Sequence, residues 1–308
     1  MPRLGAHMSI AGGLPNAVAR ATIHGCEALQ IFSKNASQWR ARPLPREEIA
    51  AFRQAAGESG VFPIVAHASY LINIATAAPA LRAQSIAALG EELDRAEALG
   101  LQGIVLHPGA RLTASSDEAI SLVSAALGQV LKERPRGKTM ILIEHTAGQG
   151  SAMGASFEEI AAMLDGVKDG RRLGVCLDTC HLLASGYDLC STKGYEETFD
   201  AFDRLIGFER LEVFHLNDSK KPCMSRVDRH EHIGKGCIGL EPFRRLVNDA
   251  RFAHLPMILE TEKSEWRERG TMGIDPLDEM NLNVLRGLRD RPAGKAEDQK
   301  IRRKLALY

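Results

Sequence analysis

Histidine and carboxylate side chains concentrate in residues 211–239 of this 308-residue chain. The stretch opens with the run LEVF, which is typical of a buried strand, and His215 follows at its end. Asp228 and His230 come thirteen and fifteen residues after His215, and His232 lies just beyond. Imidazole and carboxylate groups are the ligands of a borderline-soft divalent metal such as zinc. The stretch therefore predicts a metal site. Its spacing alone leaves open whether Asp228 and His230, or His230 and His232, are the ligands.

A polar residue at the end of a short apolar run recurs along the chain. Runs of this kind include PIVAH, GIVLH, MILIE, GVCLD and PMILE. In chain order, the predicted strands end at His7, Phe32, His67, His107, Glu144, Asp178, His215 and Glu260. Successive ends are 25 to 45 residues apart, which leaves room for one helix and two short loops each time.

Helices are predicted in the intervals between these strands. The alanine-rich segment from Pro79 to Leu99 has a wide apolar stripe and consists of good helix formers. Ser156 and Glu159 have the spacing of a capping box at a helix N-terminus. The apolar residues expected on one face are Phe157, Ile160, Ala161 and Leu164 for the helix after Ser156, and Phe243, Leu246, Val247 and Ala250 for a later helix.

Eight short strands alternating with helices indicate a parallel sheet. Eight is also the number that closes a (β/α)8 TIM barrel, a fold of the α/β class. A doubly wound open sheet is the alternative, but it would seldom place a polar residue at the end of nearly every strand. We predict a single barrel domain over residues 1–292. Residues 293–308 are predicted to form a helical or partly disordered C-terminal extension with five basic and two acidic side chains.

In such a barrel the carboxyl ends of all strands meet on one face, so residues far apart in the chain surround one small volume. The strand ends and nearby loops supply nine candidate ligands: His67, His107, Glu144, Asp178, His181, His215, Asp228, His230 and Glu260. They exceed what one tetrahedral zinc needs, and they fit two or three metal ions that share carboxylates. Three zinc ions with four carboxylates leave a cationic pocket, as a phosphodiester substrate requires, in a chain that balances 39 basic against 39 acidic residues.

Composition places the protein in a broad class. A chain with 44% hydrophobic and 25% charged residues is ordinary for a globular protein. The N-terminus lacks an apolar segment long enough for a signal peptide, and no run of 18 apolar residues is present. We therefore expect a cytoplasmic protein with no membrane span. We also expect it to be a monomer. The six cysteines include no Cys-x-x-Cys pair and are expected to be reduced thiols.

Several segments together resemble the endonuclease IV family of zinc-dependent apurinic/apyrimidinic endonucleases. They run in order from about residue 3 to about residue 262, and GVCLDTCH followed by HLNDSK and RVDRHEHIGKG is a highly specific combination. The other matching segments are GAHMSIAGG, HASYLINIA, LHPGA, IEHTAGQG, GYDL and ILET. The resemblance implies a (β/α)8 barrel with three zinc ions. It also implies that the protein cuts double-stranded DNA 5′ to an abasic site, leaving a 3′-hydroxyl and a 5′-deoxyribose phosphate.

The resemblance also implies how the metal ions share their ligands, with manganese able to replace zinc in part. It favours Asp228 and His230 over the pair of His230 and His232. Glu144, which would bridge two ions, and Glu260 are the expected catalytic carboxylates. The implied ligand sets are His67, His107 and Glu144 for the first ion; Glu144, Asp178, His215 and Glu260 for the second; and His181, Asp228 and His230 for the third.

Loops that follow the strands carry DNA recognition in this family. Tyr70 and Leu71 match the family's wedge residues, which enter the duplex where an abasic site has no base to unstack. Ordinary packing against Ile72 is the alternative role for these two residues. Ser37 departs from the family, because better-known members carry an arginine there as a further wedge. The implied DNA contacts are Asn35, Gln38, Tyr70, Leu71 and Arg229.

Two other functions stay open on the sequence. Metal-dependent sugar isomerases and epimerases share this barrel and bind divalent metals on the same face. Their sites are usually carboxylate-rich with one or two ions, so five histidines and a third ligand set argue against them. A non-catalytic binder of damaged DNA is the remaining alternative, and the complete ligand set argues against it. Metal content would discriminate between the endonuclease and the isomerase.

Overall fold

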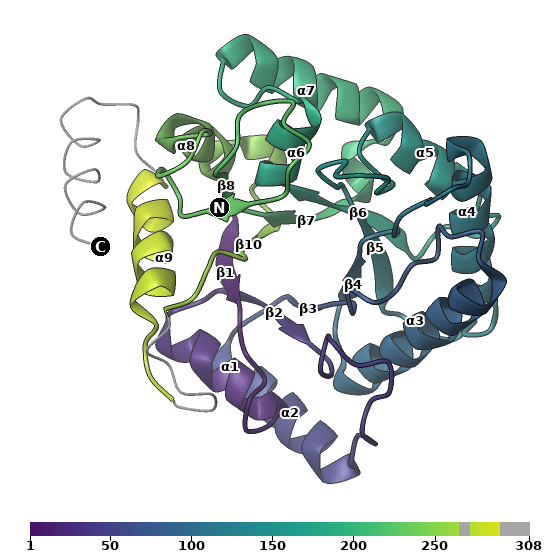
Figure 1. Cartoon of the computed structure of the whole chain (residues 1–308). Helices are drawn as coiled ribbons and strands as arrows, with labels where there is room; N and C mark the ends of the chain where they lie inside the picture. The colour runs from purple at the N-terminus through teal and green to yellow at the C-terminus, as the bar shows by residue number, and fades with distance from the viewer. Residues whose placement is uncertain (265–271, 290–308) are drawn as a thin grey trace.

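The computed structural model describes residues 1–264 and 272–289, so the predicted extension at residues 293–308 lies outside the described residues. Eight strands, each parallel to its neighbours, close into a barrel in the order β1-β10-β7-β6-β5-β4-β3-β2 (Figure 1). This confirms the predicted (β/α)8 barrel and excludes the open sheet. The barrel strands are β1 (Arg3–His7), β2 (Ala28–Phe32), β3 (Ile64–His67), β4 (Gly103–Leu106), β5 (Met140–Glu144), β6 (Leu173–Asp178), β7 (Leu211–His215) and β10 (Pro256–Leu259).

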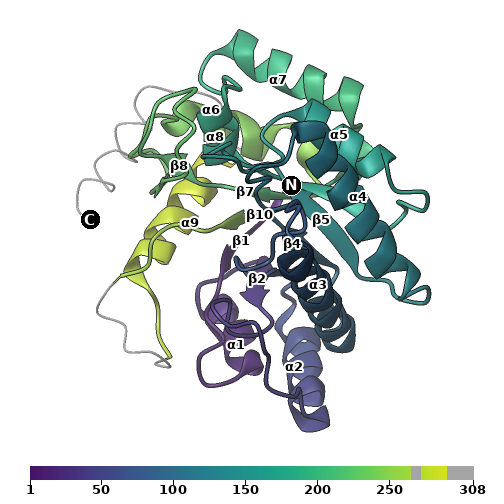
Figure 2. The same ribbon diagram turned by 45° about the vertical axis from the view of Figure 1, so that its right-hand side comes forward.

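Helices surround the barrel, and at least one follows each strand (Figures 1 and 2). They are α1 (Leu14–Ile23), α2 (Arg46–Ser59), α3 (Pro79–Leu99), α4 (Ser116–Lys132), α5 (Phe157–Asp165), α6 (Thr179–Ser185), α7 (Thr192–Leu205), α8 (Leu240–Asn248) and α9 (Pro276–Leu288), with short 3-10 turns η1 (Phe208–Arg210) and η2 (Ala250–Phe252). A continuous apolar core lies between strands and helices. Each buried Leu or Phe contributes about 1.5–3 kcal/mol to folding, so this core supports the fold independently of the polar barrel mouth.

Most predicted helix signals are confirmed, with one error. The Ser156 hydroxyl accepts a hydrogen bond from the Glu159 N–H at 3.3 Å and so caps α5 as predicted. Ala250, however, does not belong to the buried face of α8. The helix ends at Asn248 because Asp249 has an extended backbone. The Asp249 carboxylate accepts a hydrogen bond from the Arg251 N–H and so begins a separate 3-10 turn. Ala250 is exposed in that turn.

An inner layer of seven apolar residues lies inside the barrel, and its position predicts which side chains at the carboxyl ends of the strands point inward. Its members are Ala28, Val65, Val105, Leu142, Cys176, Val213 and Ile258. In a strand, the residue two positions further on lies on the same face. The residues two positions after the members of the inner layer are Gln30, His67, His107, Glu144, Asp178, His215 and Glu260. These residues therefore turn inward at the carboxyl end of the barrel, although His107 and Glu260 follow their strands by one residue.

A small hairpin that the sequence analysis did not predict adds to this end of the barrel. Its strands β8 (Asp218–Ser219) and β9 (His230–Glu231) pair antiparallel, with Ser219 opposite His230. The hairpin lies beside α6 in both views (Figures 1 and 2). It brings the segment around residue 230 back over the mouth. Within the described ranges, none of the helices combines the length and apolar character needed to cross a membrane.

Candidate metal centre

Histidine and carboxylate groups meet at the carboxyl end of the barrel in sets whose ligand atoms lie within 4.8 Å of one another. Every residue predicted as a metal ligand belongs to at least one of them. The sets are His67, His107 and Glu144; Glu144, Asp178, His215 and Glu260; Asp178, His181 and His230; and Cys180, Asp228 and His230. The first two sets coincide with the first two ligand sets implied by the family resemblance.

Glu144 is the residue that joins the first two sets. It ends β5 and is fully buried. Its Oε2 lies 3.2 Å from His67 Nε2 and 2.9 Å from His107 Nε2. Its Oε1 lies 3.2 Å from His215 Nδ1. One carboxylate thus faces imidazoles from three other strands or strand ends, which is the geometry of a ligand shared between two ions.

Asp178 and Glu260 complete the surroundings of His215. Glu260 Oε2 lies 3.1 Å from His215 Nδ1, and Asp178 Oδ2 lies 4.0 Å from the same nitrogen. Asp178 is also the N-cap of α6, because its Oδ1 accepts the His181 N–H at 3.0 Å. The sequence Asp178-Thr-Cys-His181 therefore starts a helix and orients two candidate ligands at once.

Asp228 links two histidines at the third position. Its Oδ2 lies 3.2 Å from His181 Nε2 and its Oδ1 lies 3.3 Å from His230 Nε2. Cys180 also comes within ligand distance of Asp228 and His230, but burial raises the pKa of its thiol to about 12, which disfavours the thiolate. His232 turns away, with its Nδ1 3.0 Å from the side-chain amide of Asn281.

The hydrogen bonds of three histidines test whether the cluster fits metal ions. The Nδ1–H of His67 donates to the Ala68 carbonyl at 2.7 Å, that of His181 to the His145 carbonyl at 2.9 Å, and that of His230 to the Glu260 carbonyl at 3.3 Å. Because a carbonyl oxygen only accepts, a proton sits on Nδ1 in each ring, and the neutral form of the ring would present its lone pair at Nε2 to a metal ion. In each ring, Nε2 then faces a carboxylate.

A neutral ring nitrogen and a carboxylate oxygen are both acceptors, so their close approach requires a proton or a metal ion between them. Within residues 1–264 and 272–289, the buried Nε2 atoms of His181 and His230 have no hydrogen-bond partner. A ligating histidine in proteins typically donates its other N–H to a carbonyl or carboxylate, as these rings do. The donor set of imidazoles and carboxylates therefore fits divalent ions of the zinc type.

The charges of the cluster point the same way. Burial alone would raise the pKa of Glu144, but the charges of His107 and His215 outweigh burial and hold that pKa well below its ordinary value. Burial likewise opposes ionisation of Glu260, and His215 is the main group that lowers its pKa. For His181, burial lowers the pKa, but neighbouring carboxylates, Asp178 first, raise it well above its ordinary value. Ionised carboxylates at this density are balanced by protonated histidines or, when the histidines act as neutral ligands, by bound metal ions.

Gln30 is a site residue that the sequence analysis missed. It is fully buried in β2 and occupies the inward position two residues after Ala28. Its Oε1 accepts from His215 Nε2 at 2.8 Å, and its Nε2 donates to Glu260 Oε1. These bonds leave His215 Nδ1 to face the carboxylates. The sequence offers one signal for it, a lone polar residue inside the apolar run ALQIF, whose predicted strand end is Phe32.

Asn217 and Asp218 support the cluster from the segment after β7. The Asn217 amide donates to Asp178 Oδ2 at 2.6 Å and accepts the Glu260 N–H at 2.9 Å. The buried Asp218 carboxylate accepts backbone N–H groups at Gly234 and Gly236, both at 3.0 Å. It thereby holds the turn that follows β9 and fixes the hairpin that carries Asp228 and His230.

The predicted DNA contacts lie on two loops beside the metal centre and on the β8–β9 hairpin. We define residues 33–42 as the first recognition loop and residues 68–73 as the second. Asn35, Gln38 and Arg229 are exposed, and Leu71 is partly buried. Tyr70 is 65% exposed, and its ring centroid lies 5.2 Å from that of His67. Ser37, where an arginine was noted in relatives, folds back on Asn35 Oδ1 at 2.7 Å.

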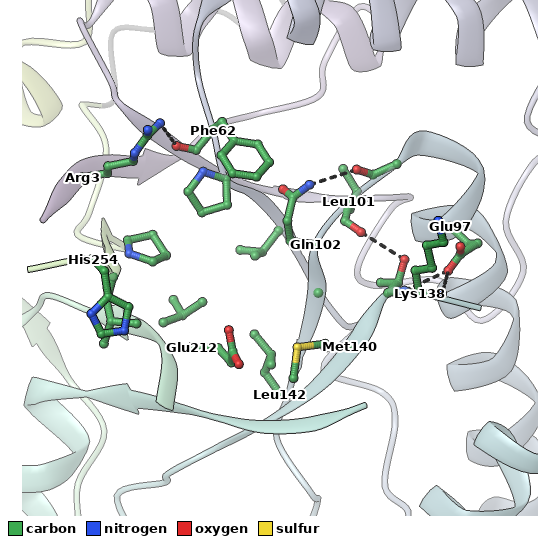
Figure 3. A pocket seen from close by; sticks show the side chains of 18 of the residues that line it. Arg3, Phe62, Glu97, Leu101, Gln102, Lys138, Met140, Leu142, Glu212 and His254 are labelled. Carbon is green, nitrogen blue, oxygen red and sulfur yellow. Dashed lines mark hydrogen bonds between the residues drawn. The ribbon is translucent and has the colours of Figure 1, made fainter. Parts of the chain in front are cut away.

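Two cavities mark the two ends of the barrel. A cavity of about 290 Å³ at the carboxyl end is lined by members of the cluster, including His67, His181 and Asp228, and by Tyr70 of the second recognition loop. A larger cavity of about 860 Å³ lies at the amino end, where Glu212 is one of its lining residues (Figure 3). The lining residues of the larger cavity include none of the predicted metal ligands.

Comparisons with known proteins agree with this geometry. The model of the xylose isomerase-like TIM barrel family matches residues 18–280. A Chloroflexus aurantiacus protein named probable endonuclease 4 is 49% identical over 288 residues, which cover 94% of this chain and 98% of that protein. The crystal structure of endonuclease IV from Thermus thermophilus is similar with a TM-score of 0.81 and 38% identity, covering 93% of this chain and 98% of that one. The structure of L-ribulose 3-epimerase, with a TM-score of 0.68 and 16% identity over 100% of this chain and 98% of that one, shares the fold alone. The chain belongs to the endonuclease IV family of DNA-cleaving hydrolases, within the xylose isomerase-like TIM barrels.

Proposed function

We propose that this protein hydrolyses the phosphodiester on the 5′ side of an abasic site in double-stranded DNA, with three zinc ions held at the carboxyl end of the barrel. The products are a 3′-hydroxyl and a 5′-deoxyribose phosphate. The observation that carries the proposal is the buried Glu144 carboxylate, which faces His67, His107 and His215 at 2.9–3.2 Å and so joins two ligand sets.

We assign the nine candidate ligands to three ions, with Glu144 shared between the first two. The proposed sets are His67, His107 and Glu144; Glu144, Asp178, His215 and Glu260; and His181, Asp228 and His230. The third set is supported by Asp228, which reaches both histidines through its two oxygens. Partial replacement of zinc by manganese is compatible with these ligands, since carboxylates and imidazoles serve both metals.

The protein's own residues hold the metal ions and orient the ligands around them. Bound zinc ions supply Lewis acidity at the phosphate and make water nucleophilic at neutral pH. Glu144 and Glu260 would bind the ions as carboxylates, and the neighbouring histidines, when protonated, already lower the pKa of both groups. Gln30 and Asn217 fix the orientation of His215, Asp178 and Glu260 by hydrogen bonds. Ligands held in this way need little reorganisation as negative charge develops on the oxygens around the phosphorus.

Recognition of the lesion is assigned to the two recognition loops and the β8–β9 hairpin. Tyr70 is exposed, and its ring centroid lies 5.2 Å from that of His67 and 6.5 Å from that of His107. Insertion of the Tyr70 side chain into the duplex would therefore bring the DNA backbone close to the metal ligands. An abasic site lacks a base, so the unstacking that insertion requires is cheap there. Asn35, Gln38, Leu71 and Arg229 complete the proposed contact set.

The test is cleavage of a duplex that carries a single abasic site, with an intact duplex as control. We expect incision only at the lesion, ends that are a 3′-hydroxyl and a 5′-deoxyribose phosphate, loss of incision after chelation and recovery when zinc is returned. Full incision in the presence of excess chelator would contradict the metal mechanism. Epimerisation of a free ketose with one bound ion, and no incision, would instead support the sugar-enzyme alternative.

A further inference from the structure

The two recognition loops rest on the same helix through a buried charge pair. Lys34 in the first loop is 6% exposed, and Glu92 on α3 is 1% exposed. Lys34 Nζ lies 3.5 Å from Glu92 Oε1. The same Glu92 oxygen accepts the N–H of Ser69, in the second loop, at 3.0 Å. One carboxylate of α3 therefore contacts both loops.

Further bonds tie each loop to the other and to α3. The Lys34 ammonium donates to the Gln38 carbonyl at 2.6 Å, which closes the turn inside the first loop. The Ser69 hydroxyl donates to the Ala36 carbonyl at 2.5 Å, which is a direct link between the loops. The Lys34 and Ser69 side chains that make these bonds are buried, whereas Asn35 and Gln38 of the first loop expose their side chains.

Arg95 pins both ends of the first recognition loop. It lies one helical turn after Glu92 on α3, so both side chains project from one face of the helix. Its guanidinium donates to the Ser33 carbonyl at 2.5 Å and to the Arg42 carbonyl at 3.0 Å. Arg95 is 8% exposed. The loop is thus bound at its start, at its end and, through Lys34, in its middle.

A buried ion pair is a weak device for stability, because apolar residues of similar volume are often as good or better. Burial raises the pKa of Glu92, and the Lys34 charge and the Ser69 N–H work against that rise. What the pair does provide is a hydrogen-bond partner for one backbone group in each loop, the Gln38 carbonyl and the Ser69 N–H. Loops fixed in advance avoid the ordering cost that flexible loops incur on binding.

We propose that Lys34, Glu92, Ser69 and Arg95 are positioning residues that hold the two recognition loops as one preformed surface for abasic DNA. This inference rests on the proposed function. It assigns the four residues no contact with DNA and no part in the hydrolysis. Their effect is exerted through the exposed side chains that they position, Asn35 and Gln38 on one loop and Tyr70 on the other.

The test replaces the pair by apolar residues of similar size, Lys34→Met with Glu92→Leu. A single change would leave a buried charge without its partner and endanger folding, whereas the double variant removes both charges. We expect unchanged zinc content, faster amide hydrogen exchange in both recognition loops of the free protein, and a KM for abasic duplex raised about tenfold, with kcat changed by less than about threefold. Should the double variant not fold, Ser69→Ala, which cuts the bond between the loops, takes its place with the same expectations.

Glu97→Gln is the matched control. Glu97 lies on the same helix, and its carboxylate accepts the N–H groups of Lys138 and Thr139 at the other end of the barrel. The control should leave exchange in the recognition loops and KM as in wild type. Unchanged exchange in both loops of the double variant would overturn the inference, and so would faster exchange with unaltered KM. Hydrogen exchange needs no DNA, so it decides the coupling even if the wild-type protein does not cleave abasic duplexes and the proposed function fails.

Discussion

The two mouths of the barrel are built by the same strands and differ in almost every chemical respect. At the amino end, Val65, Leu142 and Val213 of the inner layer line a cavity of about 860 Å³ together with Glu212 and Met140 (Figure 3). Two residues further along the same three strands, His67, Glu144 and His215 converge on the candidate metal centre. The cavity beside that centre measures only about 290 Å³.

This contrast shows that the candidate metal ligands gather at the carboxyl ends of the strands, although the larger cavity lies at the amino ends. Parallel strands bring all their carboxyl ends together, and the loops that follow them are free to vary. The inner layer of apolar residues separates the two mouths. Substitutions at one mouth should therefore act on cleavage, and equivalent substitutions at the other should act on stability alone.

Of the substitutions at the two ends of the barrel, removal of the shared Glu144 carboxylate should reduce cleavage most. We expect Glu144→Ala to lower cleavage of an abasic duplex by about a hundredfold or more, since metal ions contribute several kcal/mol to the transition state. The apolar core should keep the variant folded, which circular dichroism and thermal unfolding would show. Cleavage within tenfold of wild type would remove Glu144 from its bridging role.

Gln30→Leu should have the next largest effect, because it keeps side-chain volume but releases His215 and Glu260. Residues that orient metal ligands typically change metal affinity or activity by about 10–100-fold. We expect a loss in that range, with part of the activity recovered at higher zinc concentration. A variant as active as wild type at limiting zinc would show that the hydrogen bonds of Gln30 do not set the geometry.

Tyr70→Ala tests whether the second recognition loop recognises the abasic site. Stacking of an aromatic side chain on a base is worth about 1–3 kcal/mol, so binding to abasic duplex should weaken about tenfold or somewhat more. Hydrolysis of a small phosphodiester that needs no DNA bending should hardly change. Equal affinity of variant and wild type for abasic DNA would assign Tyr70 a packing role against Phe32 and His67.

Glu212→Leu at the amino mouth should have the smallest effect and serves as the matched control for Glu144→Ala. Cleavage should equal that of wild type. Burial raises the pKa of Glu212, so the folded state holds this proton more tightly than the unfolded state. The free energy of unfolding of wild type relative to the variant should therefore fall as pH rises from about 4.3, the unfolded-state value, through the raised pKa. A difference that grows with pH would mean that Glu212 has a cationic partner.

The barrel and the strand-end ligands were predictable because both follow from short periodicities. The run MILIE, for example, places Leu142 in the inner layer and Glu144 two residues on, at the mouth. Gln30 follows the same period, but a rule based on strand ends points to Phe32, and Gln30 lies two residues earlier inside an otherwise apolar strand. The boundary of α8 was misjudged at Ala250 because Asp249 begins a new turn inside an apparently regular spacing.

The third ligand set could not be chosen from spacing, because it depends on contacts between distant segments. His230 reaches the cluster through the pairing of β9 with β8, and Asp218 holds the following turn by accepting the N–H groups of Gly234 and Gly236. His232, only two residues away, contacts Asn281 of α9 instead. The coupling of the recognition loops through Lys34 and Glu92 is likewise a long-range contact that no local pattern indicates.

The number of metal ions bound per chain, followed together with cleavage during graded chelation, tests the account most directly. Elemental analysis of the purified protein should find about three zinc or zinc-like ions, as the ligand sets require. Incision of the abasic duplex should fall as ions are withdrawn and return with zinc, and Asp228→Ala should bind fewer ions than wild type. One ion per chain, or magnesium alone, in a protein that incises abasic DNA fully would contradict the trinuclear centre.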